Sequence, residues 1–574
     1  MGVFMFLPMY FLCKKINIKE KYGTAFLIAF FLTAFNLNIP NYIFHGFHFP
    51  NSLPARESFI YIFLLVTIVY QVIVHIDCFT RKQIAGSFFG GIGVMLLIEE
   101  FYVKKDTYPF EIVYMSMLFL TFYFIITIAL TNKKINKTFV VYLLFIVCIS
   151  EATINSDHEQ SYKTTGYSSY LKDNEAIEKL VSEIDDNSFY RIEKLSRKTK
   201  NDAAWNDYHG VSIFSSTANG NFTEFLGRLG FEKSTNAYSY YGSTPFTSAL
   251  LSVKYVLSNK LIEDPYFMTL YSYNEEESRY LYKQDYSLPL GFMIPADFTD
   301  KWLCEGNNPF AVQNSFVESA TGYTDMFTQV YAACKGAYTT IEPTEDCDLY
   351  VYVTNYIDNI SWDIQNADGS SGDYGSASGL NHRQIVHIGN VSAGSTITVT
   401  STDAVTSLQL YAYAFHEDIF DIAYKTLESE GLEITTFEDT YIKGKINAKE
   451  DGLMYTSIIY DRGWTAYIDG KEVEISSINE ALLAIPVPAG SHTIELKYCP
   501  ENLVSGLVIT AVSIALLVFL IIMDRRKAKA ADISSAVEVN SVDTDNIDND
   551  NSEDVSDINE SDDTSNESDI SSAD

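Results

Sequence analysis

The distribution of apolar residues constrains this chain more than any other feature. Apolar runs crowd residues 2–150 and recur at 503–523, while the stretch between them is polar, rich in tyrosine and punctuated by turns. This division argues against a soluble globule, and a hydrophobic content of 47% is too high for a wholly disordered chain. The pattern predicts a polytopic α-helical membrane protein that carries a large water-facing region.

Seven apolar runs are candidates for membrane segments, because a bilayer core of about 30 Å requires roughly 20 residues of helix. The first is cut short by the start of the chain. The runs lie at about residues 2–13, 22–36, 58–76, 84–98, 111–130, 138–150 and 503–523.

The orientation follows from lysine and arginine, which stay on the cytoplasmic side of membrane segments. If all seven runs span, the basic clusters at 14–21, 81–82, 133–137 and 525–527 share one side. We therefore expect residues 151–502 to be extracytoplasmic and the C-terminus to be cytoplasmic, in the cell membrane. The same count leaves the N-terminus outside. We accordingly expect upstream helices, either in a longer protein or in a separate membrane chain that completes this one.

The expected domains follow this topology. Six membrane segments within residues 1–150 precede an α/β region at 151–290, a β-rich, sandwich-like domain at 291–431 and a small β domain at 432–500. The membrane helix at 503–523 leads into a cytoplasmic, disordered acidic tail at 524–574. Residues 531–574 hold fifteen acidic residues and no basic one, a composition typical of disorder.

Local patterns predict several elements within the water-facing region. Residues 174–185, NEAIEKLVSEID, have an apolar stripe at helical spacing behind a possible Asp173 cap. In residues 348–357, DLYVYVTNYI, Leu349, Val351 and Val353 alternate with tyrosines, which suits a strand of a sandwich with an exposed outer face. Asp469 and Gly470 lie between two alternating runs, which predicts a hairpin with a type I′ turn.

Charge and cysteine content exclude several functions. There are 40 basic and 74 acidic residues, so the formal net charge is −34 and a nucleic-acid partner is not expected. The acidic exterior either solubilises the protein or attracts cations of the cell wall. Cys334 and Cys347 could pair, but no cysteine or histidine spacing indicates a metal site, and no cofactor is expected.

The loop HGFHFPNSLPARESF offers the first candidate site. Arg56 and Glu57 stand at the start of an apolar run, where a charged residue is either a membrane anchor or a clamp for the phosphate of a lipid-linked ligand. His45 and His48, three positions apart, are either packing residues or ligands, and Asn51 lies between the two pairs. Glu99 and Glu100, at the next outer membrane edge, allow the same two readings as Arg56.

Several stretches resemble the YfhO family of bacterial membrane proteins. They are PNSLPARESF, FSSTANGNFTEFLGRLGF, LLSVKYVLS, IIYDRGWTAYIDGKEV and PAGSHTIELKY, and they follow the order found in the family over residues 50 to about 500. Ile459 stands where the family often has proline.

The resemblance implies a glycosyltransferase of the GT-C type, which uses a polyprenyl-phosphate sugar as donor on the outer face of the membrane. Such proteins are associated with glycosylation of lipoteichoic acid or another cell-wall polymer. The family's catalytic carboxylate lies in an earlier outer loop, which we expect to be absent here, so no residue inherits that role. The alternative is a non-catalytic wall-binding or scaffolding protein. A transporter ranks last, because the apolar runs hold almost no ionisable residues.

Overall fold

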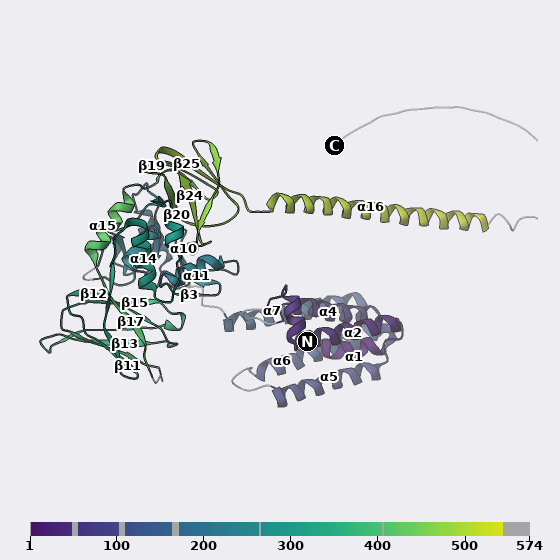
Figure 1. The fold of residues 1–574 in the computed structure, drawn as a ribbon. Coiled ribbons are helices and arrows are strands. Elements are labelled where there is room, and N and C mark those ends of the chain that lie inside the picture. The colour runs from purple at the N-terminus through teal and green to yellow at the C-terminus, as the bar shows by residue number, and fades with distance from the viewer. Residues whose placement is uncertain are drawn as a thin grey trace, which may run out of the picture. The chain divides into compact units, whose positions relative to one another are not determined.

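The computed structural model describes residues 2–48, 55–102, 110–163, 171–262, 266–403 and 407–542, with the backbone alone at 159–163 and 530–542. The chain divides into two compact units, Met1–Leu171 and Lys172–Asp574, and each is described by itself (Figure 1).

The first unit is helical throughout its described residues. Each of the first six predicted runs forms a helix, although they differ in length. The elements are α1 (Val3–Leu12), α2 (Ile18–Ala34), α3 (Asn38–Phe44), α4 (Ser58–Val74), η1 (Ile76–Cys78), α5 (Arg81–Tyr102), α6 (Phe110–Thr131) and α7 (Lys137–Lys163).

Fewer helices than expected are long enough to cross a membrane. Among the described residues, four helical stretches are long and apolar enough to cross a membrane: Arg81–Phe101, Phe110–Thr131, Lys137–His158 and Leu503–Lys529. α2 and α3 meet at 98° and together would make a fifth, broken span, whereas α1 and α4 are shorter. The last span in the first unit also extends beyond the predicted run and includes Glu151, whose carboxylate accepts a hydrogen bond from Tyr123 of α6.

The packing of this unit suits a lipid environment. α1 is the best buried helix, since Met5 and Met9 have no exposed surface, and it contacts α4, α5 and α6. Large apolar side chains such as Phe63, Phe89 and Phe139 point outward and are exposed. An apolar exterior around an apolar core is what a membrane bundle requires.

The second unit begins with a mixed sheet in the order β1-β5-β7-β6, in which β1 and β5 are parallel and the other pairs are antiparallel. Helix α9 (Asn174–Ser182) packs Ile177 and Leu180 against it, as the predicted apolar stripe requires. The strands are β1 (Arg191–Lys194), β5 (Val253–Ser258), β6 (Met268–Asn274) and β7 (Arg279–Gln284).

The predicted capping role of Asp173 is wrong. Asp173 occupies the N-cap position of α9, but its side chain makes no capping hydrogen bond and its φ is 76°. The carboxylate instead pairs with Arg279 at 2.6 Å and with Lys198 at 3.7 Å. Two distant cations therefore take the carboxylate that the local pattern assigned to the helix.

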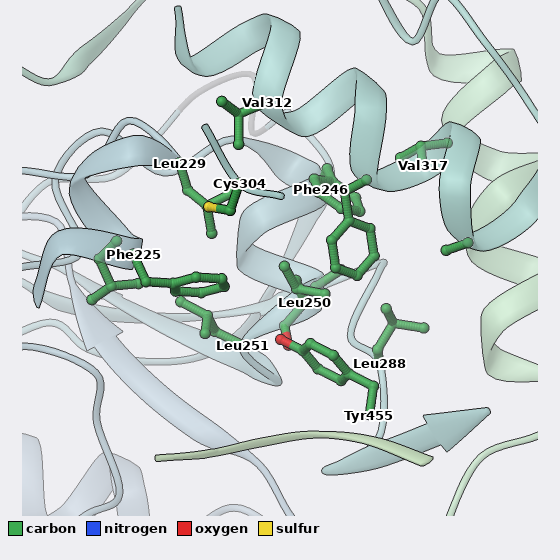
Figure 2. Close-up of a cluster of buried hydrophobic side chains, with 14 of the residues drawn as sticks. Phe225, Leu229, Phe246, Leu250, Leu251, Leu288, Cys304, Val312, Val317 and Tyr455 are labelled. Atoms are coloured by element: carbon green, nitrogen blue, oxygen red, sulfur yellow. The ribbon is translucent and has the colours of Figure 1, made fainter. Parts of the chain in front are cut away.

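A group of helices forms the centre of the second unit around an apolar core to which Phe225, Phe246 and Tyr455 contribute (Figure 2). Three short strands, β2-β4-β3, lie beside them. These elements are α10 (Asp202–Trp205), α11 (Gly220–Arg228), α12 (Pro245–Leu250), α13 (Phe298–Lys301), α14 (Pro309–Thr321), α15 (Glu417–Glu428), β2 (Ile213–Phe214), β3 (Lys233–Ser234) and β4 (Ala237–Tyr238).

The first β-sandwich packs sheet β15-β12-β17-β9 against sheet β10-β11-β16-β13-β14. The strands are β9 (Phe327–Val330), β10 (Ala332–Cys334), β11 (Tyr338–Ile341), β12 (Cys347–Val353), β13 (Ile360–Gln365), β14 (Ser371–Ala377), β15 (Ile385–Val391), β16 (Thr396–Ser401) and β17 (Leu410–Phe415); a short η2 (Leu380–His382) precedes β15. Cys334 and Cys347 are free thiols on different sheets.

β12 corrects the expected exposure of the sandwich. Leu349, Val351 and Val353 face the sandwich core as predicted, but Tyr350 and Tyr352 are also buried, in the central helical core. Both faces of β12 are therefore covered, so the outer face of this strand does not meet solvent.

The second β-sandwich packs sheet β18-β19-β25-β21-β22 against sheet β23-β24-β20-β8. Asp469 and Gly470 connect β21 to β22 with φ values of 52° and 79°, which confirms the predicted hairpin. The strands are β8 (Gly291–Pro295), β18 (Glu433–Glu438), β19 (Tyr441–Ala448), β20 (Gly452–Ile459), β21 (Trp464–Ile468), β22 (Lys471–Val473), β23 (Ser476–Ile478), β24 (Leu482–Val487) and β25 (Gly490–Tyr498).

Two contacts join the early and late parts of the second unit. β8 pairs with β20, so the small β domain expected at 432–500 shares a sheet with residues 291–295. Arg191 of β1 is partly buried, and its guanidinium donates to the carbonyl of Leu251 at 2.7 Å and to the hydroxyl and carbonyl of Ser457 at 2.8 and 2.9 Å. Burial lowers the pKa of Arg191 to about 10.

The second unit ends in helix α16 (Leu503–Val542), which contains the apolar span Leu503–Lys529. The helix continues past residue 523, where we expected order to end. The rest of the expected tail, 543–574, lies outside the described residues, and the cytoplasmic location of the tail stays a prediction, as do the domain boundaries at 150, 290 and 431.

Candidate functional site

The predicted loop site lies between the end of α3 and the start of α4. The backbone leaves α3 through Gly46 and Phe47, with φ values of 68° and 62°, and it approaches α4 through Ala55 with a φ of 58°. Phe47 and Ala55 carry Cβ atoms in a left-handed conformation, which is costly and often accompanies functional sites. Asn51, one of the predicted site residues, lies outside the described residues.

Both helix ends pack on α2. The ring of Phe31 lies 6.2 Å from that of Phe44, the last residue of α3, and 6.2 Å from that of Tyr61 in the first turn of α4. Phe35 adds an edge contact to Tyr61 at 5.6 Å. The aromatic side chains of α2 therefore fix both ends between which the predicted site residues lie.

Glu57 is the most unusual residue of this region. It is 5% exposed, and neither of its carboxylate oxygens has a hydrogen-bond partner in the described structure. It occupies the N-cap position of α4, yet its side chain makes no capping bond. Burying a carboxylate without a partner costs several kcal/mol (order of magnitude). A ligand that donates hydrogen bonds would remove this cost.

Two more polar atoms, on α3 and at its C-terminal end, are also buried without a hydrogen-bond partner among the described residues. His45 Nδ1 lies 2.6 Å from the backbone oxygen of Asn41, whereas His45 Nε2 is buried and has no partner among the described residues. The side-chain oxygen of Asn41 is also buried without a partner. Sequence reasoning selected His45 but missed Asn41, although its position one helical turn before His45 was a usable signal.

The other predicted residues behave differently. Arg56 and His48 are exposed, so Arg56 is accessible at the membrane edge beside the buried Glu57. Glu99 accepts a 2.6 Å hydrogen bond from the Tyr114 hydroxyl, and Glu100 is exposed. Of the three carboxylates considered from the sequence, Glu57 alone combines burial with missing partners.

The donor set gives no indication of a metal. In the part of the chain that the structure describes, no three His, Cys, Asp or Glu side chains cluster in a way that could hold an ion. The residues on the two sides of the loop instead supply a guanidinium, an imidazole, an amide and a carboxylate, each of which can recognise hydroxyl groups or phosphate oxygens.

The family comparison decides what kind of protein this is. The model of the family described as bacterial membrane protein YfhO matches residues 1–510. The chain belongs to the YfhO family. This match confirms the resemblance drawn from the sequence motifs and, with the apolar helices, supports a location in the membrane.

Other comparisons add little to the YfhO assignment. No curated protein matches the chain. Among solved structures, vicilin from Solanum lycopersicum (tomato) is 10% identical, with 29% of this chain and 71% of that chain covered and a TM-score of 0.09. A cupin 2 conserved barrel domain protein from Leptotrichia buccalis is 11% identical, with 30% and 87% covered and a TM-score of 0.09. Likeness at this level carries no argument about fold or function.

Proposed function

We propose that this YfhO protein is the membrane component of a glycosyltransferase. It would take a sugar from a polyprenyl-phosphate donor and transfer it to a cell-envelope polymer such as lipoteichoic acid, with the donor bound at Arg56 and Glu57. The observation that carries the proposal is the buried carboxylate of Glu57, which has no partner among the described residues and follows an exposed arginine at the start of the apolar helix α4.

Arg56 is suited to the phosphate of the donor. A polyprenyl phosphate presents its charge at the membrane boundary, and a guanidinium can bind two phosphate oxygens with parallel hydrogen bonds. At the adjacent N-terminus of α4, the N–H groups of Ser58 and Ile60 already donate to the carbonyls of Ala55 and Glu57 at 3.0 Å, so Arg56 is the group that would bind the phosphate. Phosphate would therefore lie on the Arg56 side of the site and the sugar on the Glu57 side.

Glu57 is suited to the acceptor hydroxyl. In the transfer, the acceptor oxygen forms a bond to the anomeric carbon, and the bond from that carbon to the phosphate oxygen breaks. Polyprenyl phosphate leaves with the bonding electrons, and the hydroxyl proton passes to a carboxylate. If this chain transfers sugar without a partner chain, Glu57 is the carboxylate that would accept this proton.

A non-catalytic wall-binding protein remains the second candidate, because the first β-sandwich and its neighbouring loops expose large tyrosines. Tyr331, Tyr356 and Tyr374 are 76%, 79% and 86% exposed. Exposed aromatic side chains can bind polymers without any chemistry. Under this alternative, substitutions at Arg56 and Glu57 would not affect sugar transfer, whereas the tyrosines would control binding to walls.

Substitution of Arg56 tests the proposal. Charge-assisted hydrogen bonds contribute on the order of 1.5–3 kcal/mol, so Arg56→Lys should raise the donor KM about tenfold, at roughly 1.4 kcal/mol per decade. Arg56→Ala should raise it further, and both proteins should reach normal membrane levels. Arg81→Ala is the matched control, since Arg81 begins α5 at the edge expected to be cytoplasmic. Full activity in a normally abundant Arg56→Ala protein would exclude the clamp.

The proposal also requires the predicted orientation. In a cysteine-free background, Tyr374→Cys and Asp545→Cys provide one labelling site on each expected side. A membrane-impermeant maleimide should modify only the cysteine at 374 in intact cells, and both after lysis. Labelling of only the cysteine at 545 in intact cells would reverse the topology.

A further inference from the structure

A second polar site lies in the second unit, immediately before α16. A cleft of about 650 Å³ is lined by residues from four separate segments, among them Asn219, Asn221, Tyr460, Arg462, Glu480 and Glu501. We name it the Arg462 cleft. Two of its segments belong to the stretches FSSTANGNFTEFLGRLGF and IIYDRGWTAYIDGKEV, on which the resemblance to the YfhO family rests.

One wall of the Arg462 cleft is fixed by Gly463. Its backbone N–H donates to Asp461 Oδ1 at 2.7 Å, and its carbonyl accepts from the N–H of Cys499 at 2.9 Å. A Cβ atom at this position would lie 2.6 Å from the Cys499 oxygen and 2.8 Å from the ring of Tyr498. A glycine is therefore required here, and it holds Asp461 and Arg462 against the end of β25.

The opposite wall comes from α11 and the turn between β23 and β24. Asn219 donates from Nδ2 to the Tyr460 carbonyl at 3.3 Å, and Asn221 donates to Glu480 Oε2 at 3.1 Å. Asn479 and Glu480 both adopt positive φ, 51° and 54°. Residues about 240 and 260 positions apart in the sequence are thus held together around one cleft.

The charges of the Arg462 cleft point to a neutral ligand with many hydroxyls. Arg462 is exposed and has no hydrogen bond or ion pair in the described parts of the chain, so its donors are available. Three carboxylates, Asp461, Glu480 and Glu501, also line the cleft and would repel a phosphate. No metal cluster forms among the described side chains. Carboxylates that accept, a guanidinium that donates and the rings of Tyr460 and Tyr498 match the hydroxyls and the apolar face of a sugar.

The position of the Arg462 cleft limits where this sugar comes from. Glu501 is two residues before Leu503, the first residue of the apolar span of α16. Two extended residues cover no more than about 7 Å. A sugar bound here would lie at the membrane surface, where head groups of glycolipids and the lipid-proximal sugars of anchored polymers are found.

We propose that the Arg462 cleft binds the sugar of a membrane-anchored acceptor. This inference rests on the proposed glycosyltransferase function, and it assigns acceptor recognition to the second unit while donor chemistry stays at Arg56 and Glu57.

The test measures binding to the full chain in nanodiscs of phosphatidylglycerol that contain diglucosyl or digalactosyl diacylglycerol. Native mass spectrometry should detect retained glycolipid, and Arg462→Ala and Glu480→Gln should each weaken its retention at least tenfold. Lys471→Ala and Glu472→Gln are matched controls, because both residues are exposed in the β21–β22 hairpin and neither lines the cleft. Both controls should retain the glycolipid as the wild type does.

Three results would overturn the inference. The first is equal glycolipid retention by the wild type and the cleft variants. The second is that the wild type retains plain phosphatidylglycerol as well as it retains glycolipid. The third is that it binds the free disaccharides maltose and melibiose as tightly as the glycolipid, which would exclude a membrane-anchored source of the sugar. Thermal midpoints of the variants should match that of the wild type, which excludes misfolding. Glu57→Gln separates the two proposals, since it should lower sugar transfer by about a hundredfold or more and leave glycolipid retention intact. Loss of retention in Glu57→Gln would contradict two separate sites.

Discussion

Two glutamates with the same exposure occupy opposite electrostatic situations in the two units. Glu57, in the membrane unit, and Glu232, in the second unit, are each 5% exposed. Glu232 is bound by Arg197 at 2.6 Å, Lys200 at 2.9 Å and the Ser239 hydroxyl. Glu57 has no partner among the described residues.

A third glutamate shows that Glu232 is not an exception within its unit. Glu193 is also 5% exposed, and it accepts hydrogen bonds from the N–H groups of Val211 and Ser212 and from the Ser212 hydroxyl. Glu232 and Glu193 are therefore both satisfied within the second unit, where they stabilise the fold. Glu57 has no such partners in the described parts of the chain, so a role in binding a ligand explains its burial better than a role in stabilising the fold.

The largest expected effect is on stability, at Glu232. Glu232→Ala leaves Arg197 and Lys200 without their carboxylate, which costs about 3–5 kcal/mol for a buried pair. The thermal midpoint should fall by several degrees in a fluorescence melting experiment. Glu224→Ala, which removes an exposed partner of Lys233, should change it little. Equal midpoints for the two variants would contradict the distinction between buried and exposed pairs.

The same cluster should give a dependence on pH. Burial alone would raise the pKa of Glu232, but hydrogen bonds from Ser239, Lys200 and Arg197 hold it below its ordinary value of 4.5. A lowered pKa in the folded state means that the stabilisation is complete above 4.5 and is lost as pH falls. The difference in midpoint between wild type and Glu232→Ala should accordingly shrink in acid.

Glu57→Gln should lower activity without lowering stability, whereas Glu232→Ala lowers stability. The substitution removes a buried charge that has no partner, so the thermal midpoint should stay the same or rise. In an assay where this chain transfers sugar without a partner chain, transfer should fall by about a hundredfold or more, as is typical for loss of a general base. Glu100→Gln, at an exposed membrane edge, is the control. A lower midpoint with normal transfer would make Glu57 a structural residue like Glu232.

The smallest effect is expected where the acidic partner of a pair is exposed to solvent. His492 Nδ1 lies 2.8 Å from Asp469 Oδ2 beside the hairpin turn, and this hydrogen bond raises the pKa of His492 above 6.5. The stabilisation is therefore present below pH 6.5 and lost as pH rises through the folded-state pKa. The midpoint of the wild type should decline slightly between pH 6 and 8 relative to His492→Gln. Parallel curves for the two proteins would show that the pair contributes nothing.

Features that depend on neighbouring residues could be predicted from the sequence. The hairpin at Asp469 and Gly470 and the apolar stripe of α9 are local, and both were confirmed. The capping role of Asp173 failed because Arg279, more than a hundred positions later, binds its carboxylate. The tyrosine face of β12 was misjudged for the same reason, since the helices that cover it come from other parts of the chain.

The candidate sites divide in the same way. Position beside an apolar run selected Arg56 and Glu57, but no sequence pattern revealed that Glu57 is buried without partners. The Arg462 cleft could not be predicted, because Asn219 and Tyr460 meet only after the whole second unit has folded.

The hydrogen bonds of Arg191 to Ser457 cannot form until late in the synthesis of the chain. The acceptors on Ser457 lie 266 residues later in the chain. At a synthesis rate of about 5–20 residues per second, that delay is roughly 13–53 seconds. During this time the Arg191 guanidinium lacks its acceptors on Ser457, and β8 is not yet paired because β20 has not been synthesised. The second unit therefore lacks these contacts while nearly half of the chain is being translated, so its unpaired strand and partly buried cation need protection from aggregation during that time.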